Sequence, residues 1–262
     1  MTAGRAPLAE VVAYLDQYLR AREVPDDPNA LNGLQVENSG AVTRVVAAVD
    51  ASQQTIEGLP TSQPGTLLLV HHGMFWDGNQ PVSGRRYRKV RALIERDAAL
   101  YAAHIPLDVH PEVGNNAVLA RRLGLTATDW FGLHKGIPIG VAGAAPAGLN
   151  RREALAPALA RVLGIAPEAI RVIPGGPEVV RRIGVITGGA GSAIGQAHTA
   201  GCDTYITGEG AAHTYFDATE LGVNVVYAGH YATETVGVQA LAQHLGDRFG
   251  LPWDFHHHPT GM

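Results

Sequence analysis

Short apolar runs of strand composition alternate with helical patterns along this chain, and the alternation occurs twice. The first series is TRVVAAVDAS (43–52), TLLLVHHG (66–73) and ALYAAHIPLD (99–108), and the second is RIGVITGGAG (182–191), CDTYITGEG (202–210) and VNVVYAGH (223–230). Continuous apolar runs are typical of strands buried on both faces of a parallel sheet. Because such strands alternate with helices, we predict an α/β fold with two related lobes, each containing a mostly parallel sheet.

The two series have matching internal spacing, which supports the division into two lobes. Asp50 and His71 are 21 positions apart, as are Gly188 and Glu209. A chain of 262 residues also lies near the size at which one hydrophobic core usually divides. We place the first lobe at residues 1–128 and the second at 129–262, and leave open whether the two interleave. The Gly- and Pro-rich segment 130–150 is expected to carry short strands and to cross between the lobes.

Composition excludes several classes of protein. A net charge of −4 and a pI near 6.3 lack the broad electropositive footprint of a nucleic-acid-binding domain. The single cysteine, Cys202, cannot form an internal disulfide or a Cys-rich zinc site, and we expect a small buried side chain. The amino-terminal segment lacks the apolar run of a signal peptide, and no later run reaches the ~20 residues of a membrane span. We therefore expect a soluble, cytoplasmic protein.

Five potential metal ligands follow apolar runs: His71, His72, Asp108, His230 and Glu234. Strand ends are where an open α/β sheet presents chemistry, and imidazole and carboxylate groups bind Zn, Mn, Fe or Co. Three imidazoles and two carboxylates, one of them shared, could hold two ions. We expect these ions in a cleft between the lobes.

Each ligand run also has a less specific interpretation. His230 and Glu234 are four residues apart, so one helical turn places both on one face; the alternative is a solvated pair. His71 and His72 cannot both face the core of a regular strand, so we expect them to leave it in a turn. The alternative is one packed and one solvated histidine. A lone Asp at the position of Asp108 is more often a cap for the helix expected at NNAVLARRLG than a ligand, and only the other ligand runs favour metal binding.

Further polar residues accompany the candidate ligands. His104 and Glu209 could move protons, and Glu209 with His213 could face a substrate or support a ligand. Asp50 could orient a ligand histidine. GGAGS (188–192) could offer backbone N–H groups to an anion, but a simple tight turn is the favoured interpretation. The basic run 85–89 could attract a phosphate, although such a run is usually a solvated face or a subunit contact.

Several motifs together resemble one known family. NGLQV, VVAAVD, HHG, HIPLD followed by GNN, DTYITGE and GHYATE occur in the order and spacing of the NIF-three-like dinuclear metal-centre family, which is often described as GTP cyclohydrolase I type 2. The resemblance extends from Asn32 to the terminal HPTG and matches the short form that lacks an inserted domain. One departure is Gly73 with the following MFW, where the family more commonly has Pro and an aliphatic residue. This change is expected to alter the wall of the pocket.

The resemblance implies a function and an assembly. His71, His72, Asp108, His230 and Glu234 would bind two divalent ions with Glu234 as the bridge, and His104 would lie near the centre. Six chains would form a ring whose sites face an internal cavity. We expect a metal-dependent hydrolase of a small nucleotide-like or heterocyclic substrate. The alternative is a non-catalytic metal-binding regulatory or scaffold protein, in which the ions staple the lobes together or are themselves the cargo.

Overall fold

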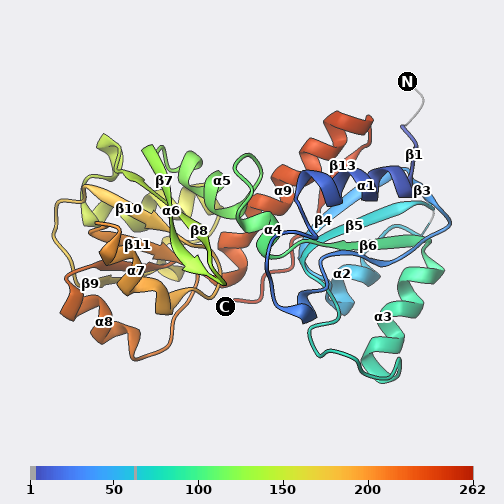
Figure 1. Cartoon of the computed structure of the whole chain (residues 1–262), viewed down its shortest axis with the longest axis horizontal. Coiled ribbons are helices and arrows are strands. Elements are labelled where there is room, and N and C mark those ends of the chain that lie inside the picture. The colour runs from blue at the N-terminus through green and yellow to red at the C-terminus, as the bar shows by residue number, and fades with distance from the viewer. Residues whose placement is uncertain (1–3, 62–63, 262) are drawn as a thin grey trace. The chain divides into compact units, whose positions relative to one another are not determined.

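The chain forms two compact units in the computed structural model, which describes residues 4–61 and 64–261 (Figure 1). The first unit contains the residues up to Val113 and also Val238–His258, and the second contains Gly114–Gly237 and the residues from Pro259. From the sequence we predicted the boundary between the two lobes after residue 128. Because the chain returns to the first unit near its end, helix α9 (His230–Phe249) begins in the second unit and ends in the first.

A mostly parallel sheet forms the centre of the first unit. Its strand order is β13-β4-β5-β6-β2, in which β13, β4, β5 and β6 are parallel and β2 is antiparallel to β6. The strands are β2 (Gly33–Val36), β4 (Arg44–Asp50), β5 (Thr66–His72), β6 (Ala98–Ala102) and β13 (Trp253–Phe255), and a separate pair joins β1 (Ala6–Pro7) to β3 (Ala41–Val42). The segment LNGLQVENSG (31–40) has the composition of a loop, but residues within it form β2 and pair with β6.

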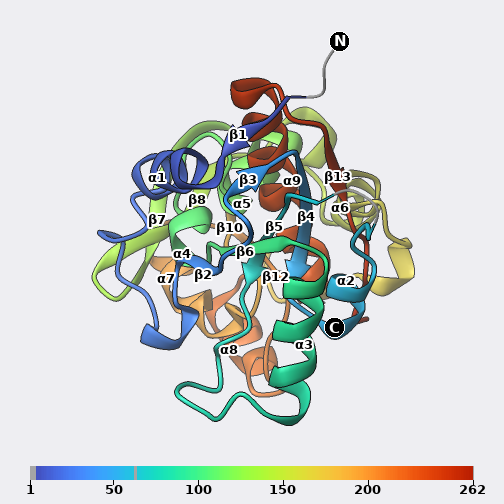
Figure 2. The same ribbon diagram turned by 90° about the vertical axis from the view of Figure 1, so that its right-hand side faces the viewer.

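Helices cover both faces of this sheet (Figures 1 and 2). On one face, α2 (Gln53–Glu57) and α3 (Gly84–Glu95) bury Ile56 and Leu93 in a core cluster with residues of β4, β5 and β6. On the other, α1 (Leu8–Tyr18) packs its apolar stripe, and the Tyr101 hydroxyl of β6 donates to Asp16 of α1 at 2.8 Å. A short helix, α4 (Ile105–Asp108), follows β6. Burial of each large aliphatic side chain contributes roughly 1.5–3 kcal/mol.

The second unit contains the other α/β sheet. Its strand order is β7-β8-β10-β11-β12-β9, in which β10, β11 and β12 are parallel, β8 and β9 are antiparallel to them, and β7 is antiparallel to β8. The elements are β7 (Thr126–His134), β8 (Ile137–Ala144), β9 (Arg171–Pro174), β10 (Arg182–Val185), β11 (Thr204–Thr207) and β12 (Asn224–Tyr227), with helices α5 (Asn115–Arg122), α6 (Leu155–Leu163), α7 (Ile194–Thr199) and α8 (Thr214–Leu221). The parallel centres of the two sheets confirm the predicted α/β class.

One core cluster of the second unit lies between its sheet and the helices α7 and α8. Cys202 is buried there beside Tyr205 and Ala197, as predicted for a small structural side chain. Burial raises the pKa of its thiol to about 11. Within the described ranges, no helix combines the length and the apolar composition needed to cross a membrane.

The Gly- and Pro-rich segment predicted to cross between the lobes forms the hairpin β7–β8 instead. Lys135 and Gly136, at its turn, both have positive φ angles, 49° and 85°. Two consecutive residues of this kind give a type I′ turn, whose twist matches that of paired strands. The whole hairpin belongs to the second unit.

Candidate metal centre

The first group of candidate ligands lies at the carboxyl ends of β5 and β6. His71 and His72 are the last two residues of β5, and His104 follows β6. The chain then turns into α4, with Pro106 in its first turn, so that Asp108 comes one helical turn after His104. Asp108 is buried, and its Oδ2 lies 3.6 Å from His71 Nε2. We call His71, His72, His104 and Asp108 the first cluster.

The imidazoles of the first cluster face a common centre. One ring nitrogen from each of His71, His72 and His104 lies within 4.8 Å of the others. The rings of His71 and His72 are 4.7 Å apart, and both residues belong to β5, so the prediction that they leave the strand in a turn is wrong. The chain instead leaves the strand after His72, and His71 is fully buried while His72 is partly exposed.

An oxygen atom holds Nδ1 of each of these imidazoles. His71 Nδ1 lies 2.8 Å from the carbonyl oxygen of Ala103, and His72 Nδ1 lies 2.9 Å from Asp50 Oδ1. Asp50 and His72 are register partners at the ends of adjacent parallel strands, which places the two side chains together. This contact confirms that Asp50 orients His72. An Nδ1–H donated to oxygen fixes the ring and directs Nε2 toward a metal ion.

Asp26 holds His104 and was not anticipated from the sequence. Its carboxylate lies 2.9 Å from His104 Nδ1 and accepts from Asn32 Nδ2 at 2.8 Å and from the backbone N–H of Ile105 at 3.0 Å. Burial opposes the charge of Asp26, but His104, Asn32 and the backbone N–H of Asp27 together lower its pKa to about 2. The only signal in the sequence is an Asp in a loop far from His104, which does not indicate a contact.

The second group of candidate ligands lies where β12 gives way to α9. His230 is the first residue of α9, and its Nε2 lies 3.2 Å from Oε1 of the buried Glu234, one turn later. The shared helix face predicted for this pair is therefore confirmed. His230 Nδ1 lies 2.7 Å from Glu209 Oε1, so Glu209 supports the ring from behind. We call His230, Glu234 and Glu209 the second cluster. His213, which was expected to act together with Glu209, is exposed.

The carboxylates of the second cluster change the ionisation of His230. The hydrogen bond and charge of Glu234, with a further contribution from Glu209, raise the pKa of His230 to about 9, although burial opposes this. In the absence of metal the imidazole therefore holds a proton at neutral pH. A metal ion that binds Nε2 must displace that proton.

The glycine turn GGAGS packs directly against the second cluster. Gly188 has a φ of +72°, and a Cβ added to it would lie 2.2 Å from Glu234 Oε1. Its backbone N–H donates to Thr233 Oγ1 of α9 at 3.0 Å, and its carbonyl oxygen accepts from the N–H groups of Gly208 and Glu209. Glycine is needed here for a tight turn and a close approach to Glu234, in agreement with the favoured interpretation of this motif.

Both clusters fit a divalent transition metal by the chemistry of their donors. All four imidazoles have Nδ1 next to an oxygen, three of them next to a carboxylate. This arrangement is typical of histidines that bind metal through Nε2. Buried carboxylates, Asp108 and Glu234, complete a nitrogen and oxygen donor set that suits Zn, Mn, Fe or Co.

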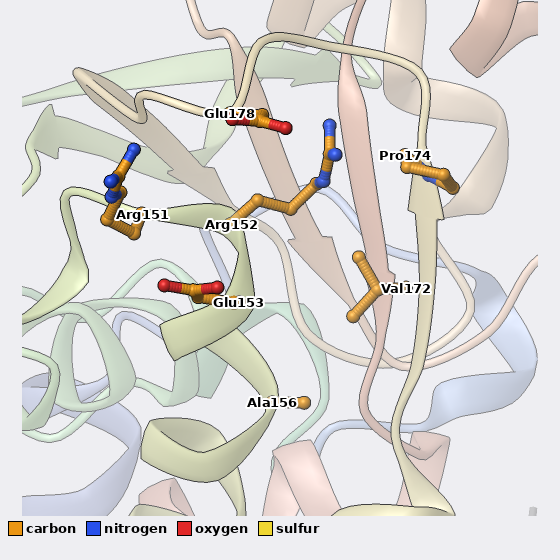
Figure 3. A pocket seen from close by; sticks show the side chains of 7 residues that line it. All are labelled: Arg151, Arg152, Glu153, Ala156, Val172, Pro174 and Glu178. Carbon is orange, nitrogen blue, oxygen red and sulfur yellow. The ribbon is translucent and has the colours of Figure 1, made fainter.

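A separate cavity of about 380 Å³ lies in the second unit and contains none of these residues (Figure 3). It is lined by Arg151, Arg152, Glu153, Ala156, Val172, Pro174 and Glu178. Arg152 extends through its centre and donates to the carbonyl oxygen of Gly176 at 3.0 Å. Its arginines and glutamates balance in charge, so the cavity has no strong preference for an anion or a cation.

Comparison with known proteins gives the family. The model of the Duf34/NIF3 (NGG1p interacting factor 3) family matches residues 6–260. Proteins named GTP cyclohydrolase 1 type 2 homolog are 46% identical in Deinococcus radiodurans, covering 97% of this chain and 94% of the relative, and 40% identical in Halobacterium salinarum, covering 97% and 99%. A crystal structure from Thermus thermophilus is similar with a TM-score of 0.85 and 41% identity, covering 98% of this chain and all of that one. The chain therefore belongs to the Duf34/NIF3 family.

Proposed function

We propose that this chain binds two divalent metal ions and uses them to hydrolyse a small nucleotide-like or other heterocyclic substrate. The observation that carries the proposal is the support of three histidines, His71, His72 and His230, each with Nδ1 next to an oxygen and therefore prepared to bind a metal ion through Nε2. Solvated or purely structural histidines do not require an oxygen next to Nδ1 of every ring. The names of the Deinococcus and Halobacterium relatives support a nucleotide-like substrate.

The proposed ligands are His71, His72 and Asp108 from the first unit and His230 and Glu234 from the second. Glu234 is the proposed bridge, because its carboxylate is buried and offers two oxygens. Asp108 would be a terminal ligand of one ion, and its Oδ2 lies 3.6 Å from His71 Nε2. When bound, two such ions supply Lewis acidity and orient the substrate for attack by water.

His104 is the proposed proton carrier. Its Nδ1 lies 2.9 Å from Asp26 Oδ1, so a proton on Nδ1 is donated to that carboxylate and the lone pair lies on Nε2. An imidazole in this tautomer can accept a proton from an attacking water and return it to a leaving group. Glu209, the other residue expected to move protons, has an Oε1 engaged by His230 Nδ1, and we assign it to orienting that ring.

A screen of metal-defined protein tests the proposed function. Wild type, Glu234→Ala and the exposed control Glu220→Gln are each assayed against nucleotides, phosphoesters and cyclic amides. We expect at least one substrate to be hydrolysed by wild type and control, with activity lost in Glu234→Ala and after chelation. No turnover of any class by fully loaded protein would contradict the proposal. Unfolding on chelation would instead support the alternative in which the ions staple the chain.

A further inference from the structure

The cavity of about 380 Å³ in the second unit has walls from three segments (Figure 3). The first is segment 151–156, where the chain enters α6, the second is the strand β9, and the third is the loop that follows β9. Val172 and Pro174 of β9 are register partners of Val226 and Asn224 of β12, so this wall belongs to the sheet. The volume of the cavity lies within the range of ~300–1,000 Å³ that is usual for sites of small molecules.

The loop that follows β9 is held in place by Asn224, a buried residue at the start of β12. Its Oδ1 accepts from the backbone N–H of Gly176 at 3.1 Å, and its Nδ2 donates to the carbonyl oxygen of Pro177 at 2.8 Å. The carbonyl oxygen of the next residue, Glu178, accepts from the backbone N–H of Arg152 at 3.0 Å. The backbone that carries Glu178 is therefore fixed on both sides.

Arg152 presents its guanidinium to the cavity from a fixed position (Figure 3). Its side chain is half-buried, and its Nη1 donates to the carbonyl oxygen of Gly176 at 3.0 Å. A guanidinium has five N–H donors in a planar fork that matches the geometry of a carboxylate. The donors that Gly176 does not engage can bind a carboxylate, and the side chain loses little entropy on binding because it is already held.

Two positive and two negative side chains line the cavity, namely Arg151, Arg152, Glu153 and Glu178. In the part of the chain that the structure describes, none of the four forms an ion pair with another side chain. Each can therefore bind an opposite charge on a ligand through charge-assisted hydrogen bonds. The other lining residues are apolar: Ala156, Val172 and Pro174. A ligand that uses every wall has a positive group, a negative group and a short apolar chain.

We propose that this cavity binds a small zwitterion with an aliphatic side chain, of the class of the α-amino acids, with its carboxylate at Arg152 and its ammonium group at Glu153 and Glu178. A simple anion would leave both glutamates facing another negative charge, and a simple cation would do the same to the arginines. A free amino acid fits better than a peptide, because each end of a peptide carries only one of the two charges. The cavity contains none of the residues of the two clusters, so this inference goes beyond the proposed function.

Isothermal titration calorimetry with three ligands that share an isobutyl group tests the proposal. L-leucine carries both charges, 4-methylpentanoate lacks the ammonium group, and 3-methylbutylamine lacks the carboxylate. We expect wild type to bind L-leucine with a Kd of about 1 mM or lower and each analogue at least about tenfold more weakly, because each analogue loses the charge-assisted hydrogen bonds of one group.

Variants of the cavity should weaken the binding of L-leucine. We expect a rise in Kd of about tenfold or more for Arg152→Gln and for the double variant Glu153→Gln with Glu178→Gln. Arg171→Gln is the matched control for charge, since this exposed residue of β9 does not line the cavity.

Filling the cavity tests the location of the site without a change in charge. Ala156→Leu places a larger side chain in the cavity and should abolish the binding of L-leucine. Ala158→Leu is the matched control, because Ala158 is half-buried on the same helix, α6, and does not line this cavity. Circular dichroism of each variant verifies that it is folded.

Three results would overturn the proposal. The first is no binding of L-leucine by wild type at about 10 mM, the second is an analogue that binds as tightly as L-leucine, and the third is equal binding of L-leucine by folded Ala156→Leu and Ala158→Leu. The comparison of the three ligands uses wild type alone, so it decides the proposal even if a variant does not fold. Because none of these measurements depends on bound metal or turnover, their outcome is distinct from that of the proposed function.

Discussion

Replacing Asp26 by Asn should destabilise the chain and change how its stability depends on pH. The carboxylate is 6% exposed and accepts hydrogen bonds from His104, Asn32 and the backbone N–H of Ile105. Burial opposes its charge, but His104, Asn32 and the backbone N–H of Asp27 lower its pKa from 3.8 to about 2. A shift of this size corresponds to about 2 kcal/mol of folding free energy, because one pKa unit is worth about 1.4 kcal/mol.

The sign of the effect follows from the lowered pKa. An Asp that is more acidic in the folded state stabilises folding above its ordinary pKa of 3.8, and this contribution is lost as the pH falls toward 2. At pH 7 we therefore expect Asp26→Asn to lower the free energy of unfolding by about 2 kcal/mol. Between about pH 4 and pH 2, wild type should lose stability more steeply than the variant.

Urea unfolding of metal-free protein, followed by circular dichroism at several pH values, measures both quantities. Glu220→Gln is the control, since this exposed carboxylate lies on α8 in the second unit and should change stability by less than about 0.5 kcal/mol. Equal stability of wild type and Asp26→Asn at pH 7, with parallel curves at acid pH, would refute the role of Asp26 in holding His104 and the following turn.

Three other perturbations address the clusters and the assembly. Gly188→Ala should weaken metal binding by about tenfold or more, because the added Cβ would overlap Glu234 Oε1. Gly195→Ala is the control and should leave metal affinity unchanged, because the space around Gly195 is open. Equal metal affinity of the two variants would contradict this prediction. Glu234→Gln should weaken both ions in a metal titration and Asp108→Asn mainly one, and loss of both ions only in Asp108→Asn would exchange the two roles. From the resemblance given in the sequence analysis we expect six 27.6-kDa chains per ring in analytical ultracentrifugation, and a monomer at micromolar concentration would contradict this.

Much of the fold follows from local patterns in the sequence. The apolar runs that precede His72 and His230 form β5 and β12, because a continuous apolar run of this length is typical of a strand buried on both faces of a parallel sheet. The four-residue spacing of His230 and Glu234 translated directly into a shared helix face, since helical geometry depends only on neighbours along the chain. The strand NGLQV was missed because its pairing with β6 is set by tertiary contacts rather than by its own composition.

The residues that hold the histidine rings were harder to predict from the sequence than the candidate ligands themselves. Asp50 could be anticipated because it ends the strand next to His71 and His72 in a parallel sheet. Asp26 could not, since it lies 78 positions before His104 and nothing in the sequence indicates that its loop returns to the end of β6. Glu209 was recognised as polar and close to the second series of strands, but only its contact with His230 identifies it as a support for that ring.

The proposed dinuclear centre is tested most directly by counting metal ions. The protein is stripped of metal with a chelator and reconstituted at neutral pH with Zn, Mn, Fe or Co. After excess metal is removed, the bound metal is counted by elemental mass spectrometry. We expect about two ions per chain in wild type with at least one of these metals, because the two clusters offer ligands for a two-metal site. Less than about half an ion per chain with every metal would contradict the account, because the oriented imidazoles would then have no ion to bind.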